Sequence, residues 1–371
     1  MHLKTLSLVN FKNYEQVDIP FSEKINCFVG ENGVGKTNLL DAIHYLSLCK
    51  SNLNPVDSQN VRYDQDFLVI QGIFERNGKE ENIYCGIRRQ KKKQFKRNQK
   101  EYSKLSEHIG LIPLVMISPA DTVLINGGSE ERRKFMNGVI AQYSRVYLEN
   151  LIQYNRALTQ RNRLLKDFAL SRNFDQGMLE VWDEQLIRYG EPIFEERVRF
   201  VKELLPVFND FYSRVSDNRE EVSLTYKAHM LESGFKEGLE ASLEKDRIIQ
   251  YTTFGIHKDD LAMELVGHSL KRSGSQGQQK TFLVALKLAE FEFIRRRRTE
   301  IPPILLLDDI FDKFDALRVK QIINLVAENQ FGQIFITDTN EVRLNGILKE
   351  IPADHKVFRI TPDARFEEMK V

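Results

Sequence analysis

Apolar and polar positions follow a strand, turn and helix pattern at both ends of the chain. Residues 3–8 and 17–21 alternate in part, which predicts two short strands, and residues 25–29 form an apolar run typical of a buried strand. A glycine-containing turn follows, and residues 37–48 carry apolar side chains at helical intervals. Several further β-rich runs lie between residues 61 and 117. The first third of the chain therefore predicts α/β structure.

The middle of the chain has a different pattern. Apolar residues recur at helical spacing over residues 130–168, and a second helical stretch, over residues 178–214, contains two prolines that we expect to break it. Strand, loop and helix patterns return after residue 250. We therefore expect an α/β domain with a mixed sheet, built from residues 1–118 and 250–371. A helical arm is expected as an insertion at residues 119–249.

Composition narrows the class of protein. In 371 residues, 42% hydrophobic and 29% charged side chains indicate a globular protein, and 54 Lys and Arg against 53 Asp and Glu exclude a polycation. Three cysteines without a CxxC spacing argue against a disulfide framework and a cysteine-rich zinc site. The sequence shows neither a signal-peptide pattern nor an apolar run of about 20 residues, so we expect a cytoplasmic protein.

The sequence GENGVGKT at Gly30–Thr37 matches the phosphate-binding pattern G-x-x-x-x-G-K-[ST]. Its place between a predicted strand and a predicted helix is the context that such a loop requires. Glycines let backbone N–H groups close around phosphate oxygens at a helix N-terminus. We expect Lys36 to reach the β- and γ-phosphates and the Thr37 hydroxyl to hold Mg²⁺.

A second part of the site is predicted at the sequence PILLLDD. Four apolar residues end in Asp308 and Asp309, which describes a central strand delivering carboxylates to the sheet edge where ligands bind. Asp308 is expected to bind Mg²⁺, facing Thr37, and Asp309 to orient or deprotonate an attacking water. Two acids after a strand can also be a solvated strand end, but the phosphate loop favours the functional interpretation.

A glycine-serine loop, SGSQGQQK, precedes a strongly amphipathic helix and forms a second anion-binding helix start. Because one nucleotide cannot occupy two loops on different faces, we expect Ser275–Gln278 of a second subunit to cover the phosphate held by the first. An ordinary helix cap built from Ser and Gly is the alternative.

With these elements the chain resembles the ATP-binding-cassette ATPases of the SMC type, and within them the RecF family. The resemblance is carried by LSLVNFKNY, GENGVGKTNLLDAI, SPADTVLINGGSEERRKF, FGIHKDDL, SGSQGQQKTFLVALKLAE and LLLDDIFDKFD. It implies an ATPase head with a lever-like helical arm, Mg-ATP as cofactor, and slow ATP hydrolysis. Lys36 and Asp309 are implied to be catalytic, Thr37 and Asp308 to bind the metal, and Asp315 to lie at the seam between subunits. The implied nucleotide-binding residues are Gly30, Glu31, Asn32, Gly33, Val34, Gly35, Lys36, Thr37, Asn38, Ser275, Gln276, Gly277 and Gln278.

Two positions depart from the pattern of this family. The family pattern places a glutamine near Ser118–Asp121, but none is found there. Asp338 stands at or near the position where the family carries a switch histidine. A carboxylate donates a hydrogen bond to phosphate only when protonated. The turn His257–Asp260 resembles a charged turn of this family, which could position DNA phosphate or brace the Ser275–Gln278 loop. The alternative is a polar turn before a strand.

A basic run at residues 88–100 carries eight positive charges within thirteen positions. It could make salt-dependent contacts to DNA phosphates, or it could be the solvated tip of a hairpin. The resemblance implies a homodimer that closes with ATP on duplex or gapped DNA and loads recombinase with RecR and RecO. A small-molecule kinase would explain the phosphate loop but not Ser275–Gln278, and a chromosome organiser would need a longer arm. The expected DNA contacts are Arg88, Arg89, Lys91, Lys92, Lys93, Lys96 and Arg97, with Lys100 completing the run.

Overall fold

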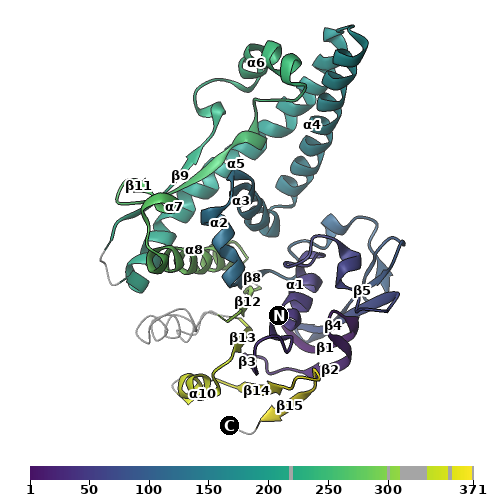
Figure 1. Cartoon of the computed structure of the whole chain (residues 1–371), viewed down its shortest axis with the longest axis vertical. Helices are drawn as coiled ribbons and strands as arrows, with labels where there is room; N and C mark the ends of the chain where they lie inside the picture. Colours follow the sequence, from purple (N-terminus) through teal and green to yellow (C-terminus); the bar gives the residue numbers. More distant parts are fainter. Residues whose placement is uncertain (217–219, 299–300, 310–331, 350–352, 370–371) are drawn as a thin grey trace. The chain divides into compact units, whose positions relative to one another are not determined.

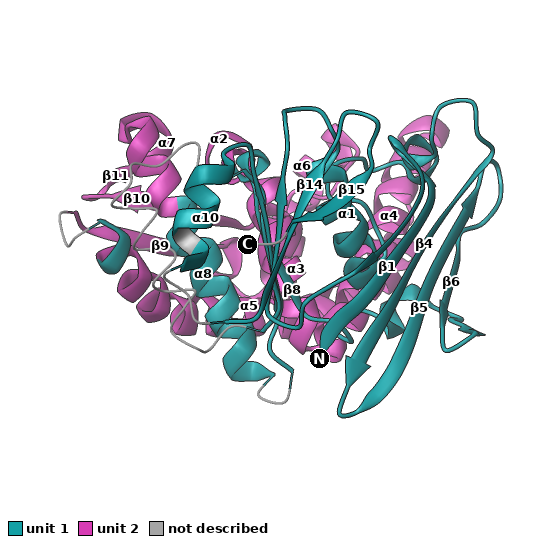
Figure 2. Cartoon of the chain, turned by 90° about the horizontal axis from the view of Figure 1, so that it is seen from below, with its two compact units in different colours: residues 1–121, 214–217, 283–371 teal, residues 122–213, 218–282 magenta. Residues whose placement is uncertain are grey.

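The computed structural model describes residues 1–216, 220–298, 301–309, 332–349 and 353–369, which form two compact units (Figures 1 and 2). Unit 1 comprises residues 1–121, 214–217 and 283–371, and unit 2 comprises residues 122–213 and 218–282. The division differs from the expected domains, because residues 250–282 group with the inserted segment. Strand pairing explains this: β10 (Asp260–Leu265) pairs along its whole length with β9 (Val222–Lys227) of the insertion.

Unit 1 contains two six-stranded sheets. The antiparallel sheet has the order β2-β1-β4-β5-β6-β7, and the second has the order β15-β14-β3-β13-β12-β8, in which only β15 runs antiparallel to its neighbour. The strands are β1 (His2–Phe11), β2 (Tyr14–Pro20), β3 (Ile25–Val29), β4 (Phe67–Arg76), β5 (Lys79–Arg88), β6 (Gln94–Arg97), β7 (Lys100–Glu101), β8 (Leu114–Ile117), β12 (Ile304–Leu307), β13 (Ile334–Asp338), β14 (His355–Ile360) and β15 (Phe366–Met369).

Helix α1 (Lys36–Leu48) lies between these sheets and contacts strands of both (Figure 2). The four apolar residues that predicted this helix, Leu39, Leu40, Ile43 and Leu46, are all buried in the core of unit 1. Burial of each such side chain contributes about 1.5–3 kcal/mol. Unit 1 also contains α10 (Glu341–Lys349) and most of α8 (Gln276–Arg297), whose first turns belong to unit 2.

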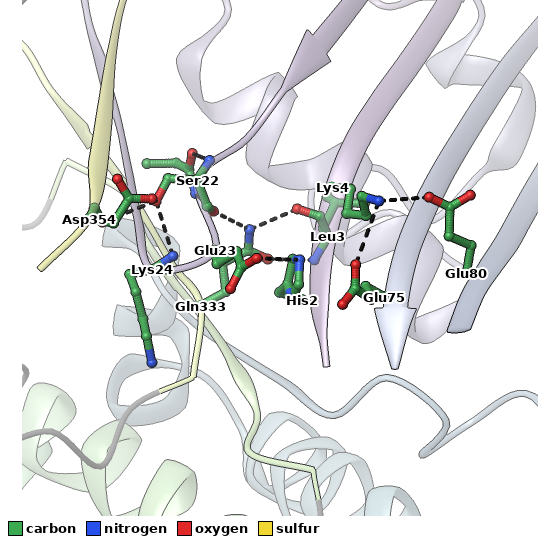
Figure 3. A network of polar contacts seen from close by, with 11 residues as sticks. His2, Leu3, Lys4, Ser22, Glu23, Lys24, Glu75, Glu80, Gln333 and Asp354 are labelled. Carbon is green, nitrogen blue, oxygen red and sulfur yellow. Dashed lines mark hydrogen bonds and ion pairs between the residues drawn. The ribbon is translucent and has the colours of Figure 1, made fainter. Parts of the chain in front are cut away.

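A buried glutamine links the two sheets of unit 1 (Figure 3). Gln333, which directly precedes β13, accepts a hydrogen bond of 2.7 Å from the backbone N–H of Leu3 on β1 and donates one of 2.8 Å to the Leu3 carbonyl. It also donates to the carbonyl of Ser22, in the turn before β3. Because these backbone groups would be costly to bury without partners, Gln333 holds the sheets in register.

Unit 2 is mainly helical, with a three-stranded sheet ordered β11-β10-β9. Its longest helix, α5 (Gln176–Ser216), runs unbroken through Pro192 and Pro206, so the expected break is wrong. Both prolines are exposed, where water can bind the freed carbonyls, while Phe200 and Phe208 on the helix are buried. The remaining elements are α2 (Val123–Asn126), α3 (Ser129–Tyr143), α4 (Arg145–Ser171), α5 (Gln176–Ser216), α6 (Phe235–Ile249), α7 (Leu270–Ser273) and β11 (His268–Ser269).

Candidate nucleotide-binding site

The predicted phosphate loop joins β3 to α1 as expected. Gly33 and Gly35 have φ angles of +88° and +112°, which side chains disfavour. A Cβ at Gly35 would also overlap the Asn13 amide, so both the backbone angle and the lack of space require glycine at this position. Glu31, Asn32 and Gly33 are exposed on the loop, and Val34 is buried beneath it. The loop therefore exposes residues 31–33 to solvent, while the buried Val34 side chain anchors it in the core.

The Lys36 side chain lies folded under this loop. It is only 3% exposed, and its ammonium donates hydrogen bonds of 2.9 Å to the Gly30 carbonyl and 3.0 Å to the Glu31 carbonyl. The ammonium is therefore held against two loop carbonyls, from where it could form charge-assisted hydrogen bonds to a bound anion.

Thr37 and Asp308 meet although they are 271 positions apart in the chain. The Thr37 hydroxyl donates a 2.9 Å hydrogen bond to Oδ1 of Asp308, and Thr337, at the end of β13, donates a second one of 2.9 Å to the same oxygen. Three parallel strands, β3, β13 and β12, bring these groups to one sheet edge. A hydroxyl and a carboxylate at this separation suit Mg²⁺, which prefers oxygen ligands.

Burial dominates the electrostatics of Asp308. Desolvation, followed by the nearby Asp309 carboxylate, raises the pKa of the Asp308 carboxyl, while hydrogen bonds from Thr337 and Thr37 and the charge of Lys36 oppose that rise. The Asp309 backbone N–H donates to the Thr337 hydroxyl at 2.9 Å, and its φ is +43°. The positive φ turns the chain sharply after Asp308, so two successive carboxylates reach the same edge.

The turn between β1 and β2 also holds the phosphate loop, although the sequence analysis assigned it no role. Asn13 donates a 2.9 Å hydrogen bond to the Val34 carbonyl and accepts one of 2.7 Å from Asn38. Tyr14 donates to the Gly35 carbonyl at 2.9 Å. The signal in the sequence was the string NFKNY, in which Lys12 and Asn13 form the tight turn between the two strands. Asn38, expected among the nucleotide ligands, is thus bound to Asn13.

The two positions that depart from the family pattern lie at the same sheet edge. Asp338 is buried and accepts hydrogen bonds from Arg343 at 2.6 and 3.0 Å and from the Asn340 N–H at 2.8 Å. Ser118 follows β8, and its backbone N–H donates to the Asp121 carboxylate at 2.7 Å. Asp338 therefore forms an ion pair within the protein. Asp315 lies outside the described residues.

The Ser275–Gln278 segment forms the alternative that the sequence analysis left open, a helix cap. The Ser275 hydroxyl accepts a hydrogen bond of 3.2 Å from the Gln278 N–H, and the Gln278 side chain accepts one of 2.6 Å from the Ser275 N–H. Ser275 and Gln276 are exposed, and Gly277 is half-buried. This segment belongs to unit 2 and the phosphate loop to unit 1.

The turn His257–Asp260 is internally bonded in unit 2. Asp259 is buried and accepts hydrogen bonds from Arg197 at 2.8 Å and from Tyr226. Asp260 accepts two from Arg132. His257 contacts the Tyr154 hydroxyl at 2.8 Å, and burial lowers the His257 pKa to about 4. These contacts therefore favour a polar turn before a strand over a contact to DNA phosphate.

The basic run extends from the last residue of β5 through β6 to the first residue of β7, and its members differ in exposure. Lys93 is mostly buried and donates to the Cys49 carbonyl at 2.7 Å and to the Tyr45 hydroxyl at 3.0 Å, besides an ion pair with Asp57. Arg97 pairs with Glu81 at 2.7 Å. Lys93 is thereby engaged within the protein, which a charge count could not reveal. The exposed members are Arg88, Arg89, Lys91, Lys92 and Lys100.

None of the helices in the described ranges is both long and apolar enough to cross a membrane.

Comparisons with known proteins identify the family of this chain. A family model described as RecF/RecN/SMC N terminal domain matches residues 2–357. The protein named DNA replication and repair protein RecF from Phocaeicola vulgatus is 53% identical over 97% of this chain and 96% of its own length. The RecF from Flavobacterium johnsoniae is 48% identical over 97% of this chain and 100% of its own.

Solved structures give the same result. A structure described as the recombination mediator protein RecF with ATP in the RecFOR pathway superposes with a TM-score of 0.88, at 29% identity, and covers 100% of this chain and 98% of that one. An SMC head bound to the C-terminal winged-helix domain of ScpA shares the fold, with a TM-score of 0.58 at 15% identity over 100% of this chain and 98% of that one. The expected α/β fold of an SMC-type ATPase head with a helical insertion is confirmed, and the chain belongs to the RecF family.

Proposed function

We propose that this protein is an ATP-dependent DNA-binding protein of replication and recombinational repair. The contact between Thr37 and Asp308 at the end of the phosphate loop carries the proposal, since it joins two distant segments in an arrangement that suits a magnesium-bound nucleotide. Support comes from relatives named DNA replication and repair protein RecF at 53% and 54% identity and from a similar structure of RecF with ATP.

The residues of unit 1 would have separate roles in ATP binding and hydrolysis. Loop amides around Gly33 and Gly35 would surround the phosphates, and the Lys36 ammonium would exchange its carbonyl partners for phosphate oxygens. Thr37 and Asp308 would hold Mg²⁺, which supplies charge neutralisation and a fixed orientation for the phosphates. Asp309 would orient the attacking water. Because aspartate reaches one methylene less far than the glutamate common in related ATPases, we expect slow hydrolysis suited to a switch.

Closure of two copies would complete the site. Ser275–Gln278 forms the start of helix α8, where Ser275 and Gln276 are exposed, and the positive end of that helix dipole would attract the γ-phosphate held by a second copy. ATP would thereby join two subunits, and hydrolysis would separate them. The exposed cations Arg88, Arg89, Lys91 and Lys92 would contact duplex phosphates in that dimer. RecR, with RecO in the same pathway, would be the protein partners that load recombinase at single-strand gaps.

DNA binding measured by fluorescence anisotropy tests this function. We expect the wild-type protein to bind a duplex tightly with Mg-ATP or a non-hydrolysable analogue and weakly with ADP. Lys36→Arg should lose most of the ATP-dependent binding, because a planar guanidinium cannot replace a compact ammonium buried beneath the loop. Equal affinity with all three nucleotides would overturn the proposal.

A further inference from the structure

Three neighbouring strands end together at one edge of the parallel sheet in unit 1. β12 lies between β8 and β13 and runs parallel to both (Figure 1). The register pairs Leu307, the last residue of β12, with Ile117 of β8 and Ile336 of β13. The residues that follow these three positions are Asp308, Ser118 and Thr337. They therefore form one polar row across the sheet edge, with the carboxylate in the middle.

The two neighbours of Asp308 in this row have different hydrogen bonds. The Thr337 hydroxyl donates to Oδ1 of Asp308 at 2.9 Å, so residues at one register position contact each other here. On the other side the Asp308 N–H donates to the Ile117 carbonyl at 2.9 Å, which keeps the two chains paired up to Ser118. Side chains at one register position of parallel strands point to the same face of a sheet. Ser118 therefore lies beside Asp308 on the face that carries its carboxylate.

The Ser118 hydroxyl is buried without a partner. The residue is 8% exposed, and no group in the described ranges forms a hydrogen bond with its Oγ. Its backbone N–H donates to the Asp121 carboxylate at 2.7 Å, which fixes the main chain but leaves the hydroxyl available. Oδ2 of Asp308 likewise has no hydrogen-bond partner in the part of the chain that the structure describes. A buried hydroxyl without a partner is unfavourable for folding, so its presence points to a bound water or ion.

A magnesium ion bound at Asp308 would supply this partner. Mg²⁺ binds six oxygens in octahedral geometry and keeps several of its waters when carboxylates and phosphates hold it. Protein groups that hydrogen-bond to the ligands of a metal orient those ligands and strengthen its binding. We propose that the Ser118 hydroxyl accepts a hydrogen bond from a water in the hydration shell of Mg²⁺, which makes Ser118 a positioning residue of the metal site. This inference rests on the proposed function and adds a residue from a third strand, β8, to its magnesium site.

The magnesium requirement for nucleotide binding tests this role. Full-length protein with a fluorescent, non-hydrolysable ATP analogue is titrated with MgCl₂, and the concentration that gives half-maximal binding is measured. Ser118→Ala should raise this concentration about tenfold, since losing such a hydrogen bond commonly weakens metal binding by that factor or more. Binding of the same analogue in excess EDTA should be equal for the variant and the wild type, because the hydroxyl acts only through Mg²⁺.

Ser47→Ala is the matched control. Ser47 on α1 is also buried, but its hydroxyl donates a 2.6 Å hydrogen bond to the Ile112 carbonyl. Both substitutions remove one buried hydroxyl from unit 1, and at Ser47 a hydrogen bond is lost with it. Ser47→Ala should therefore lower the melting temperature of the nucleotide-free protein and leave the magnesium requirement unchanged. Ser118→Ala should melt at the wild-type temperature or above it.

The possible failures are distinguishable. An unchanged magnesium requirement for Ser118→Ala, or an equal loss of binding with Mg²⁺ and with EDTA, would overturn this inference alone. A lower melting temperature for nucleotide-free Ser118→Ala would also contradict it, because the hydroxyl would then have a partner within the protein. Wild-type protein that binds the analogue equally with and without Mg²⁺ would overturn the magnesium site of the proposed function as well.

Discussion

The hydroxyl of Thr37 and the carboxylate of Asp308 are joined by a 2.9 Å hydrogen bond between the start of α1 and the end of β12. Thr337 also donates to the same carboxylate oxygen, so Asp308 has a second hydrogen-bond donor besides Thr37. Burying an ionisable carboxyl at this edge makes the free energy of folding less favourable. Such unfavourable contributions are common at binding sites that are already formed without their ligand.

Asp308→Asn should therefore stabilise the nucleotide-free protein. Burial raises the pKa of the Asp308 carboxyl above its unfolded value, so the folded state favours the protonated form, and the ionised group opposes folding at neutral pH. We expect the melting temperature to rise by roughly 2–4 °C at pH 7. The rise in melting temperature should shrink as the pH falls toward the pKa of the unfolded state. Below that pH the wild-type carboxyl is protonated in both the folded and the unfolded protein. A lower melting temperature for the variant at pH 7 would contradict this reasoning.

Gly35→Ala and Gly33→Ala should differ although both residues have positive φ. A Cβ at Gly35 would overlap the Asn13 amide, whereas nothing lies within 4 Å of one at Gly33. We expect Gly35→Ala to abolish binding of a fluorescent ATP analogue and Gly33→Ala to weaken it by about fivefold, from about 1 kcal/mol of backbone strain. Similar losses for both variants would mean that the contact with Asn13 does not shape the loop.

Asn13→Ala should reduce nucleotide affinity through the loop. It removes the hydrogen bond to the Val34 carbonyl and frees the Asn38 side chain. At about 1 kcal/mol for such a bond, the dissociation constant for ATP measured by calorimetry should rise about fivefold. Gln16→Ala, an exposed position on β2, serves as the control and should bind ATP as the wild type does.

Lys93→Ala should act on stability, and the double variant Lys91→Ala, Lys92→Ala on DNA. Truncating Lys93 leaves the Tyr45 hydroxyl, the Cys49 carbonyl and the Asp57 carboxylate without a shared cation, so we expect a loss of about 1–3 kcal/mol in chemical denaturation. The double variant should keep its stability and show a shallower salt dependence of DNA affinity. An unchanged salt dependence would mean that Lys91 and Lys92 do not contact DNA.

The sequence predicted the parts of the site that have a local pattern. The strand, glycine loop and helix around Lys36 and the carboxylates after β12 were predicted because spacing and apolar runs determine them. The role of Asn13 and the burial of Lys93 were missed, since each depends on residues distant in the chain. The continuous helix α5 was also missed, because apolar packing and exposed proline positions outweighed the local preference of Pro192 and Pro206.

The association state in the presence of nucleotide tests the central claim most directly. Light scattering during gel filtration should show wild-type protein as a monomer with ADP and a dimer with a non-hydrolysable ATP analogue. Ser275→Asp should keep its melting temperature, because aspartate also caps a helix, yet stay monomeric because its charge repels the phosphate of the second copy. Ser273→Asp, an exposed serine two positions earlier, should still dimerise. A wild-type mass that does not change with nucleotide, or a Ser275→Asp variant that dimerises normally, would contradict the account.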